Sequence, residues 1–459
     1  MKLISLIKKY PYVFLGFIAF ASGLFWVYEY AGQPIVKDAA EYDELAQSLL
    51  KNHFFGYFKE GLTMFREPGY PAFLAIVYFL FGHNVVPAMI MQILLFCGIV
   101  LLTYWLGKTL ISEIGGIIAG VFVALFPSLA GFSGNILSEM FFTFLFVSWS
   151  AIFLKAQKSR NNLLFFISGI ILGLSILTKA ITLYFIPFVL IYIIIVFYKY
   201  YKLDFKKILL IALIFFAAVF SIVMPWMLRN KHYFNTYSIT ERGGWQLWIR
   251  SYNSSLPIKQ YGQYVSSAIL GDYITLKIFP DYSGDYRSLS YIPSKQKIAE
   301  LTNLGYDETE IDDILMKEAR LNILNQPFLF MFDSIVELIK FNTPMNLRQI
   351  QITHMFVETH PGLPNILKIS VVIFIRAIWG LFLGVVIYGI YKSIKNFNSV
   401  SIISLIVIGF SLLHSLVDAV PRFSVPLYPF YFILFYYGLS KIFPAYSDRM
   451  EKLFKNPQN

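Results

Sequence analysis

Apolar residues gather along this chain in long, nearly uninterrupted runs. A helix needs about 20 mostly apolar residues to cross the hydrocarbon core of a bilayer. Ten runs approach or reach that length, and they predict membrane-spanning helices near residues 11–30, 87–107, 115–134, 138–154, 163–178, 180–198, 208–228, 367–391, 398–416 and 423–440. The pattern therefore predicts an all-α polytopic membrane protein built as a bundle of about ten transmembrane helices.

Three further patterns predict helices that do not cross. Residues 69–81 are apolar but too few to span, and they follow Pro68 and end at Gly82, so we expect a helix at the membrane interface. Residues 38–50 carry one apolar helical stripe, which predicts an amphipathic helix along the membrane surface. Residues 294–325 are amphipathic and acidic and predict a helix-like part outside the membrane.

The composition supports the same class of protein. Of the 459 residues, 57% are hydrophobic and only 14% are charged, whereas soluble domains carry about 25% charged residues. A soluble multidomain protein and a disordered chain are therefore excluded. The single cysteine, Cys97, excludes an intramolecular disulfide.

The distribution of charge predicts which side each loop occupies. With the N-terminus in the cytoplasm, the cytoplasmic segments hold 17 basic and four acidic residues, whereas the remainder holds 21 basic and 23 acidic residues. This asymmetry satisfies the positive-inside rule, and it explains the net charge of +11 without a nucleic-acid partner. We expect a multi-pass protein of the plasma membrane with both termini in the cytoplasm.

The spans divide the chain into three expected domains. Residues 1–228 form a membrane module of seven spans with a first outer loop at 31–86. Residues 229–363 form an outer region of mixed secondary structure, rich in Tyr and Trp. Residues 364–459 form a three-span module with a cytoplasmic tail. Loops this long in a compact protein are usually functional.

Polar side chains gather at the expected outer ends of the spans. Asp38 begins the first amphipathic helix, where it is either a helix cap or a functional acid. Arg66 precedes the short apolar helix, where it either snorkels or contacts a phosphate. The full set of candidates is Asp38, Glu41, Arg66, Glu67, Glu139, Lys179, Arg376, His414, Asp418 and Arg422. An acid near several cations is typical of a phosphate group held beside a base.

Other chemistry finds no support in the sequence. There is no glycine-rich phosphate loop, no zinc-type spacing of Cys and His, and no Asp-x-Asp pair for a metal and a nucleotide sugar. No cofactor is predicted, and a divalent cation is left open.

Seven segments in order resemble the GT-C superfamily of polytopic glycosyltransferases. They resemble most the branch that holds the lipid A aminoarabinose transferase and the protein O-mannosyltransferases. The segments are D-A-A-E-Y-D-E-L-A-Q-S-L-L at Asp38, R-E-P-G-Y-P at Arg66, L-S-E at Leu137, L-T-K at Leu177, P-W-M-L-R-N at Pro225, G-G-W-Q-L-W at Gly243 and P-R-F-S-V-P-L-Y-P at Pro421.

The resemblance implies a sugar donor linked to a polyprenyl phosphate, reaction on the outer face, and inversion at the anomeric carbon. The family's catalytic acid lies in the first outer loop, where Asp38 matches it. The family often has a second, adjacent acid, but this chain has Ala39 there, so Glu41 or Glu67 would supply any second carboxylate. The aminoarabinose branch has a lysine where this chain has Glu67, so the substrate of that branch is not expected here.

We therefore expect a membrane glycosyltransferase that moves a sugar to a hydroxyl or amine of a lipid, glycan or protein acceptor. Asp38 would act as the base, with help from Glu41. Arg66, Lys179, Arg376 and Arg422 would bind the donor phosphate, and Glu67, Glu139, His414 and Asp418 would support them. The alternative is a transporter or flippase of lipid-linked saccharides. A transporter should carry charges near mid-membrane on several helices, and only Arg376 approaches that depth.

Overall fold

The computed structural model describes residues 2–30, 32–59, 61–343, 362, 364–397, 399–417 and 419–455. The chain divides into two compact units, each treated separately below. Unit 1 comprises Met1–Ile239, Phe382–Val407 and Val425–Asn459, and unit 2 comprises Thr240–Leu381 and Ile408–Ser424. The three expected domains refer to the sides of a membrane, so their boundaries stay a prediction.

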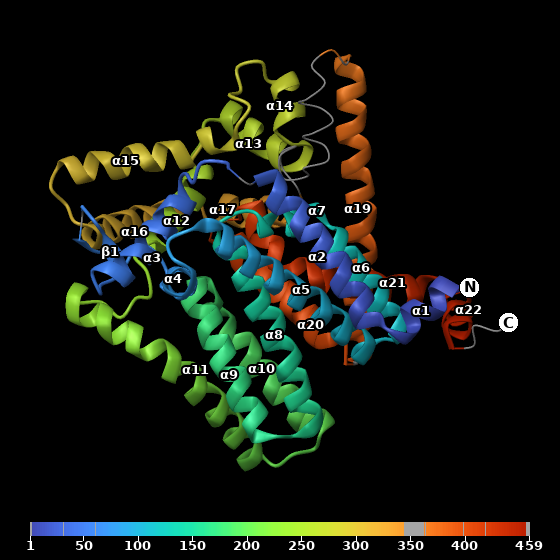
Figure 1. Ribbon diagram of the computed structural model, residues 1–459. Helices are drawn as coiled ribbons and strands as arrows, with labels where there is room; N and C mark the ends of the chain where they lie inside the picture. The colour runs from blue at the N-terminus through green and yellow to red at the C-terminus, as the bar shows by residue number, and fades with distance from the viewer. Residues whose placement is uncertain are drawn as a thin grey trace. The chain divides into compact units, whose positions relative to one another are not determined.

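Unit 1 is a helical bundle with one small hairpin (Figure 1). Its elements up to residue 239 are α1 (Lys2–Lys9), α2 (Pro11–Tyr30), α3 (Asp38–Lys51), β1 (Gly56–Tyr57), β2 (Gly61–Leu62), α4 (Gly69–Phe81), α5 (Val85–Leu110), α6 (Glu113–Leu125), α7 (Pro127–Ala130), η1 (Gly131–Ser133), α8 (Ser138–Ser159), α9 (Asn162–Thr178), η2 (Ala180–Phe185), α10 (Ile186–Ile195), η3 (Val196–Tyr200) and α11 (Phe205–Phe234). Further along the chain are α19 (Asn365–Asn396) and α20 (Ser401–Leu416), which each contribute to both units, and α21 (Tyr428–Ile442) and α22 (Pro444–Lys455).

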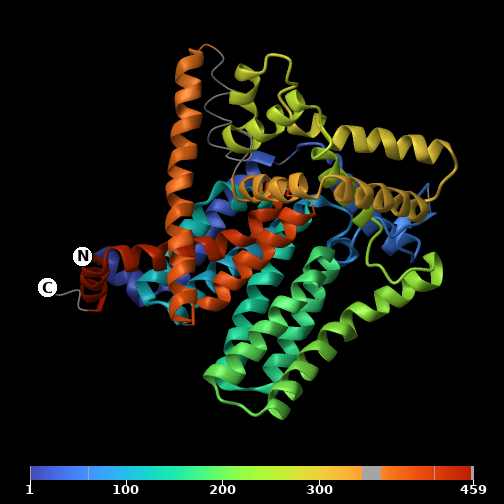
Figure 2. The ribbon, with the colours of Figure 1, turned by 180° about the vertical axis from the view of Figure 1, so that it is seen from behind.

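Small residues allow the apolar helices of unit 1 to pack closely. A Cβ on Gly107 of α5 would lie 2.7 Å from the Cα of Gly116 on α6. Membrane helices associate through such small residues because lipid offers no hydrophobic driving force between them. The helix α9 packs against α11 in the same way, since a Cβ on Gly173 would lie 2.9 Å from the Val219 carbonyl oxygen. The helices α8, α9 and α11 lie side by side in both Figure 1 and Figure 2.

The apolar helices confirm a multi-pass membrane protein. Among the described residues, six helices are long and apolar enough to cross: α2, α5, α8, the run Ala180–Tyr200, α11 and α19. A seventh candidate, α6 with Pro127–Ser133, bends by 59° where Pro127 begins the next helix. The helices expected at 163–178, 398–416 and 423–440 are present but short, as α9, α20 and α21. The count of ten spans and the side of each loop stay predictions.

The first expected outer loop folds into two helices and a hairpin within unit 1. The helix expected over 38–50 is α3, and the helix expected over 69–81 is α4, with Pro68 at its N-cap as anticipated. Between them β1 and β2 pair antiparallel, with Gly56 opposite Leu62. Because α4 has 13 residues, it spans only about 20 Å at 1.5 Å per residue, which is too short to cross.

Unit 2 is helical throughout its described part. Its elements are α12 (Gly243–Asn253), α13 (Ile258–Leu270), α14 (Asp272–Ile278), η4 (Tyr286–Ser288), α15 (Tyr291–Asn303), α16 (Glu308–Asn325), α17 (Pro327–Asn342) and η6 (Pro421–Leu427), with the first part of α19 and the last turns of α20. The η6 segment runs on into unit 1 at Val425.

One expectation for this region was wrong, and another is now more detailed. The region was expected to be of mixed structure, but residues 240–343 contain no strand. The helix-like part expected over 294–325 consists of two helices, α15 and α16, because Gly305 adopts a positive φ of 91° after α15. That conformation suits glycine and ends a helix, and Asp307 then caps α16 through a capping box with Glu310.

Candidate active site

Asp38 begins α3, but it does not cap that helix. The N-cap position is Lys37, whose φ of 56° lies in the left-handed region, and no side-chain hydrogen bond caps the helix there. Asp38 instead occupies the first helical turn, with Glu41 three residues on. The capping alternative for Asp38 is therefore wrong, although the carboxylate still favours the helix dipole.

The guanidinium of Arg66 joins these two acids. Its Nη2 donates to Oδ1 of Asp38 at 2.8 Å, and its Nε donates to Oε2 of Glu41 at 2.7 Å. Arg66 is 4% exposed, whereas Asp38 and Glu41 are 24% and 37% exposed. The buried cation therefore presents two carboxylates that solvent and a substrate can reach.

Aromatic packing and charge hold Arg66 in this position. Its guanidinium lies 5.2 Å from the centre of the Tyr42 ring, which in turn makes an edge contact with Tyr70 of α4. Burial lowers the pKa of Arg66, but Tyr42, Asp38 and Glu41 outweigh this and raise it well above its ordinary value. Arg66 is thus a permanent positive charge between the acids.

A second set of contacts fixes α3 against α4. Oδ1 of Asp43 accepts a hydrogen bond from the hydroxyl of Tyr78 at 2.6 Å and lies 3.0 Å from Nε2 of His83. Asp43, Tyr78 and His83 were not singled out from the sequence, because their pairing spans 35 and 40 residues. They hold the helix that carries Asp38.

Glu67 links the next segment to the end of α9. Its Oε1 accepts a hydrogen bond from the backbone N–H of Ala180 at 3.1 Å. The neighbouring Gly69 allows the close approach, since a Cβ there would lie 2.5 Å from Oγ1 of Thr178 and 2.8 Å from the Leu177 carbonyl oxygen. The start of α4 and the end of α9 are therefore in direct backbone contact.

Lys179 and Glu139 complete the same cluster. Nζ of Lys179 lies 3.4 Å from Oε1 of Glu139, and both side chains are largely buried. Glu139 is in the first turn of α8, beside Ser138, whose Oγ accepts a hydrogen bond from the Tyr42 hydroxyl at 3.4 Å. This bond connects α8 to α3, next to Asp38.

Six of the ten candidate residues therefore come together within unit 1. They are Asp38, Glu41, Arg66, Glu67, Glu139 and Lys179. The four acids and two cations give this cluster a formal charge of −2 before any substrate binds. Arg66 and Lys179 are both paired with carboxylates. A bound phosphate would therefore share these two cations with the acids or require additional cations.

Three of the remaining candidates belong to unit 2. Arg376 donates from Nη1 to the carbonyl oxygen of Ile269 at 2.6 Å, at the end of α13. Arg422 lies in η6 with its guanidinium 5.4 Å from the Phe423 ring. His414 is buried and stacks on Phe341, with ring centres 4.7 Å apart. Their expected roles in donor binding stay predictions, and Asp418 lies outside the described residues.

Unit 2 also contains a buried ionic network that the sequence did not suggest. Arg250 of α12 and Asp333 and Glu337 of α17 are almost fully buried. Arg250 donates to the carbonyl oxygen of Ser415, and Oε2 of Glu337 accepts from the N–H of Ala419. Both contacts hold the segment that leads to Arg422. Arg250 lies two residues after the motif G-G-W-Q-L-W that begins at Gly243.

In the part of the chain that the structure describes, no group of three or more His, Cys, Asp or Glu side chains is arranged to hold a metal ion. Asp38 and Glu41 are both bonded to Arg66, which occupies the position between them.

The family comparison matches the segment that contains most of this cluster. Residues 66–226 match the family model described as dolichyl-phosphate-mannose-protein mannosyltransferase. That segment includes Arg66, Glu67, Glu139 and Lys179. No curated protein matches the chain.

Solved structures match nearly the whole chain. The oligosaccharyltransferase AglB from Archaeoglobus fulgidus, in complex with an inhibitory peptide and a dolichol-phosphate, superposes with a TM-score of 0.54 at 13% identity, covering 99% of this chain. The apo form of the Archaeoglobus fulgidus oligosaccharyltransferase gives a TM-score of 0.56 at 14% identity and also covers 99% of this chain. In both comparisons the match spans 53% of the other protein, so the chain corresponds to about half of the length of these enzymes.

At this identity the structural likeness shows a shared fold. The family match independently supports a glycosyltransferase over the segment that carries Arg66 and Lys179. Residues 66–226 are thus similar to a glycosyltransferase family, and the chain as a whole has the fold of these oligosaccharyltransferases.

Proposed function

We propose that this protein transfers a sugar from a polyprenyl-phosphate-linked donor to an acceptor on the outer face of the membrane, with inversion at the anomeric carbon. The observation that carries the proposal is the presentation of Asp38 and Glu41 by the buried guanidinium of Arg66. The AglB complex that contains a dolichol-phosphate and a peptide supports a lipid phosphate as part of the donor and a peptide or glycan as acceptor.

In the proposed reaction Asp38 is the general base. The acceptor oxygen attacks the anomeric carbon, and the bond between that carbon and the phosphate oxygen breaks. The phosphate leaves with the bonding electron pair, and the acceptor proton moves to Asp38. Because a polyprenyl phosphate is already a stable anion, it needs positive charge nearby more than it needs a proton donor.

Arg66 acts in this scheme by positioning the acids. One guanidinium bonds Asp38 from Nη2 and Glu41 from Nε, so both carboxylates have a fixed direction before the substrate arrives. Glu41 assists as the second carboxylate, in place of the acid that the family often has directly after the first. Lys179 lies beside Glu139, and it is the cation of this cluster for which a donor phosphate would compete with that carboxylate.

The experiment that tests the proposal is mass spectrometry of envelope glycans from cells with and without the gene. A glycosyltransferase predicts the loss of one sugar from a lipid, glycan or protein and its recovery when the gene is restored. The purified protein in detergent should then form the glycosidic bond with a polyprenyl-phosphate sugar and the identified acceptor. A protein that restores the glycan in cells but forms no bond in detergent would favour the flippase alternative.

A further inference from the structure

One helix of unit 2 has its polar face inward and its apolar face outward. All three charged residues of α17, which are Asp333, Glu337 and Lys340, are buried. Every exposed residue of the same helix is apolar, and these are Pro327, Phe328, Met331, Phe332, Ile335 and Ile339. A helix on an aqueous surface shows the opposite arrangement, with its apolar stripe toward the core and its charges in water.

The inward charges of α17 are held in a bonded network. Oδ2 of Asp333 accepts from the Ser254 hydroxyl at 2.6 Å, and Oδ1 accepts from the Tyr261 hydroxyl at 2.5 Å. Oε1 of Glu337 accepts from the Tyr264 hydroxyl at 2.6 Å and from Nζ of Lys340 at 2.9 Å. Partners on α13, and Ser254 directly after α12, therefore fix which face of α17 points inward.

The outward face is one continuous stripe. Phe328, Met331, Phe332, Ile335 and Ile339 follow the spacing of three and four residues that places side chains on one side of a helix. Phe328 and Met331 are 87% and 67% exposed. Leu321 and Leu324 near the end of α16 are also exposed.

The neighbours of α17 indicate what covers this stripe. The carbonyl oxygen of Asn342, at the end of α17, accepts a hydrogen bond from Nε1 of Trp379 at 2.7 Å. Trp379 lies on α19, a candidate membrane span whose exposed residues in unit 2 include Ile373, Phe374 and Ile378. The end of α17 is therefore bonded to a helix that is itself a candidate membrane span with exposed apolar side chains. Figures 1 and 2 show α17 running across the direction of α19.

We infer that α17 lies along the membrane interface with its Phe328–Ile339 face in the acyl chains of one leaflet. Its 16 residues span about 24 Å at 1.5 Å per residue, and it carries three charges, so it does not cross the bilayer. The adjoining helix α16 marks the boundary with water, because it exposes Asp313, Lys317 and Arg320. This inference is independent of the proposed reaction.

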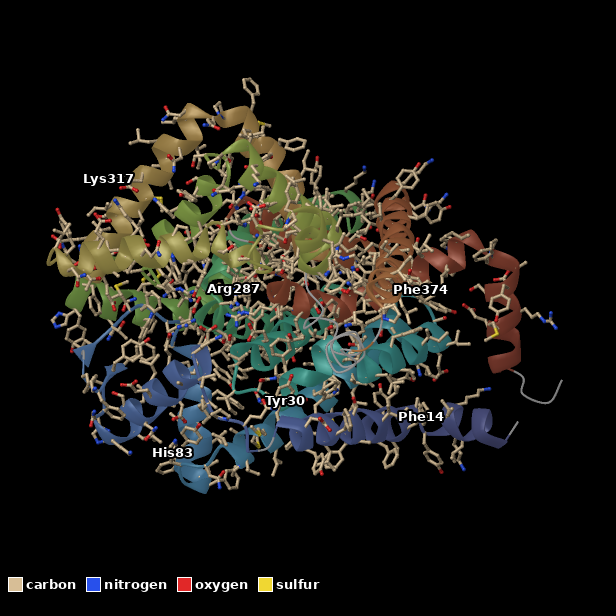
Figure 3. All side chains as sticks on the ribbon, turned by 90° about the horizontal axis from the view of Figure 1, so that it is seen from above. Phe14, Tyr30, His83, Arg287, Lys317 and Phe374 are labelled. Atoms are coloured by element: carbon tan, nitrogen blue, oxygen red, sulfur yellow. The ribbon has the colours of Figure 1, made fainter. Side chains whose placement is uncertain are left out.

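Spin labels at single cysteines test the inference. Cys97 is the one native cysteine, so a Cys97→Ala background allows Met331→Cys, Ile335→Cys and two references. The lipid reference is Phe374→Cys on α19, and the water reference is Lys317→Cys on α16, both labelled in Figure 3. All four side chains are exposed, so a nitroxide at each position displaces no buried atom. The labelled proteins are placed in phosphatidylcholine vesicles, and collisions with oxygen and with a nickel chelate are compared.

The inference predicts that the ratio of oxygen to nickel collisions at residues 331 and 335 matches the ratio at residue 374 and exceeds that at residue 317. Nickel access at 331 and 335 equal to that at 317 would place α17 in water and overturn the inference. Exclusion of both reagents would mean that protein covers the stripe, which also overturns it. Far-ultraviolet circular dichroism equal to that of the parent establishes that each variant is folded.

Discussion

Arg66 bonds two carboxylates from a single turn of α3, and this pairing is the central residue-scale feature of the cluster. The sequence identified all three side chains as candidates, but it assigned Arg66 to the donor phosphate. The bond to Asp38 joins residues 28 positions apart, and nothing in a local pattern indicates such a pairing. The geometry favours a positioning role for Arg66, since it places the acids that the sequence could only name.

Arg66→Lys tests this positioning role. A lysine keeps the charge but is a compact ammonium on a flexible stem and lacks the planar fork that reaches two carboxylates at once. We expect the variant to fold at the wild-type level and to lose about tenfold or more in kcat, within the range that misplacement of catalytic groups produces. Steady-state transfer kinetics on the purified protein measure the effect. Wild-type kcat in Arg66→Lys would show that charge alone suffices.

A second residue-scale prediction concerns Glu241, outside the spans in unit 2. Burial raises the pKa of Glu241 to about 8, and Asp312, Asp313 and Glu308 add to the shift. The Glu241 carboxyl in the folded protein therefore keeps a proton that the same carboxyl loses near pH 4.3 in the unfolded chain. Because the folded state binds more protons across this window, stability falls as the pH rises from about 4.5 to 8.

Glu241→Gln should remove this dependence, because Gln keeps a hydrogen-bond donor and cannot ionise. We expect the melting temperature of the variant to change less than that of the wild type between pH 6 and pH 8, and to be higher than the wild type at pH 8. Thermal unfolding followed by tryptophan fluorescence measures it, with Glu300→Gln on the exposed face of α15 as control. Parallel pH profiles for wild type and Glu241→Gln would show that Glu241 is ionised throughout.

At the scale of elements, the sequence predicted which segments are helical better than it predicted where helices break and which face points inward. The helix α4 has the predicted bounds, because Pro68 and Gly82 end its apolar run on both sides. The break between α15 and α16 was missed, since a glycine inside a polar pattern does not by itself reveal its φ. The orientation of α17 was also missed, because its outward residues resemble a core face until the buried partners of its charges are known.

The contact between α4 and α9 gives an element-scale prediction. In Gly69→Ala the new methyl would lie 2.5 Å from Oγ1 of Thr178 and 2.8 Å from the Leu177 carbonyl oxygen. The two helices must then separate, which we expect to cost about 1–3 kcal/mol, as overpacking usually does. Gly16→Ala on α2 is the control, because nothing lies within 4 Å of its added Cβ. Equal melting temperatures for the two variants would mean that the α4–α9 contact is looser than described.

At the scale of the whole molecule, the all-α membrane fold followed from the apolar runs alone. The side of the membrane on which each loop lies was predicted separately, from the distribution of Lys and Arg among the loops. A reporter fused after Lys158 or Lys206 should read as cytoplasmic, and a reporter near Tyr261 as external, because cytoplasmic loops retain Lys and Arg. An external reading after Lys158 would mean that α4 crosses the membrane and that Asp38 and Lys179 face opposite sides.

The most direct test of the central claim is the transfer rate of Asp38→Asn in the purified protein. The substitution keeps the size of the side chain and a hydrogen-bond acceptor for Arg66, and it removes the base. Glu44→Gln on the same helix is the matched control, because its side chain can still accept from the N–H of Phe58. We predict that Asp38→Asn melts near the wild-type temperature while transfer falls by about 10²-fold or more, and that Glu44→Gln transfers normally. Normal transfer by a folded Asp38→Asn protein would contradict the account.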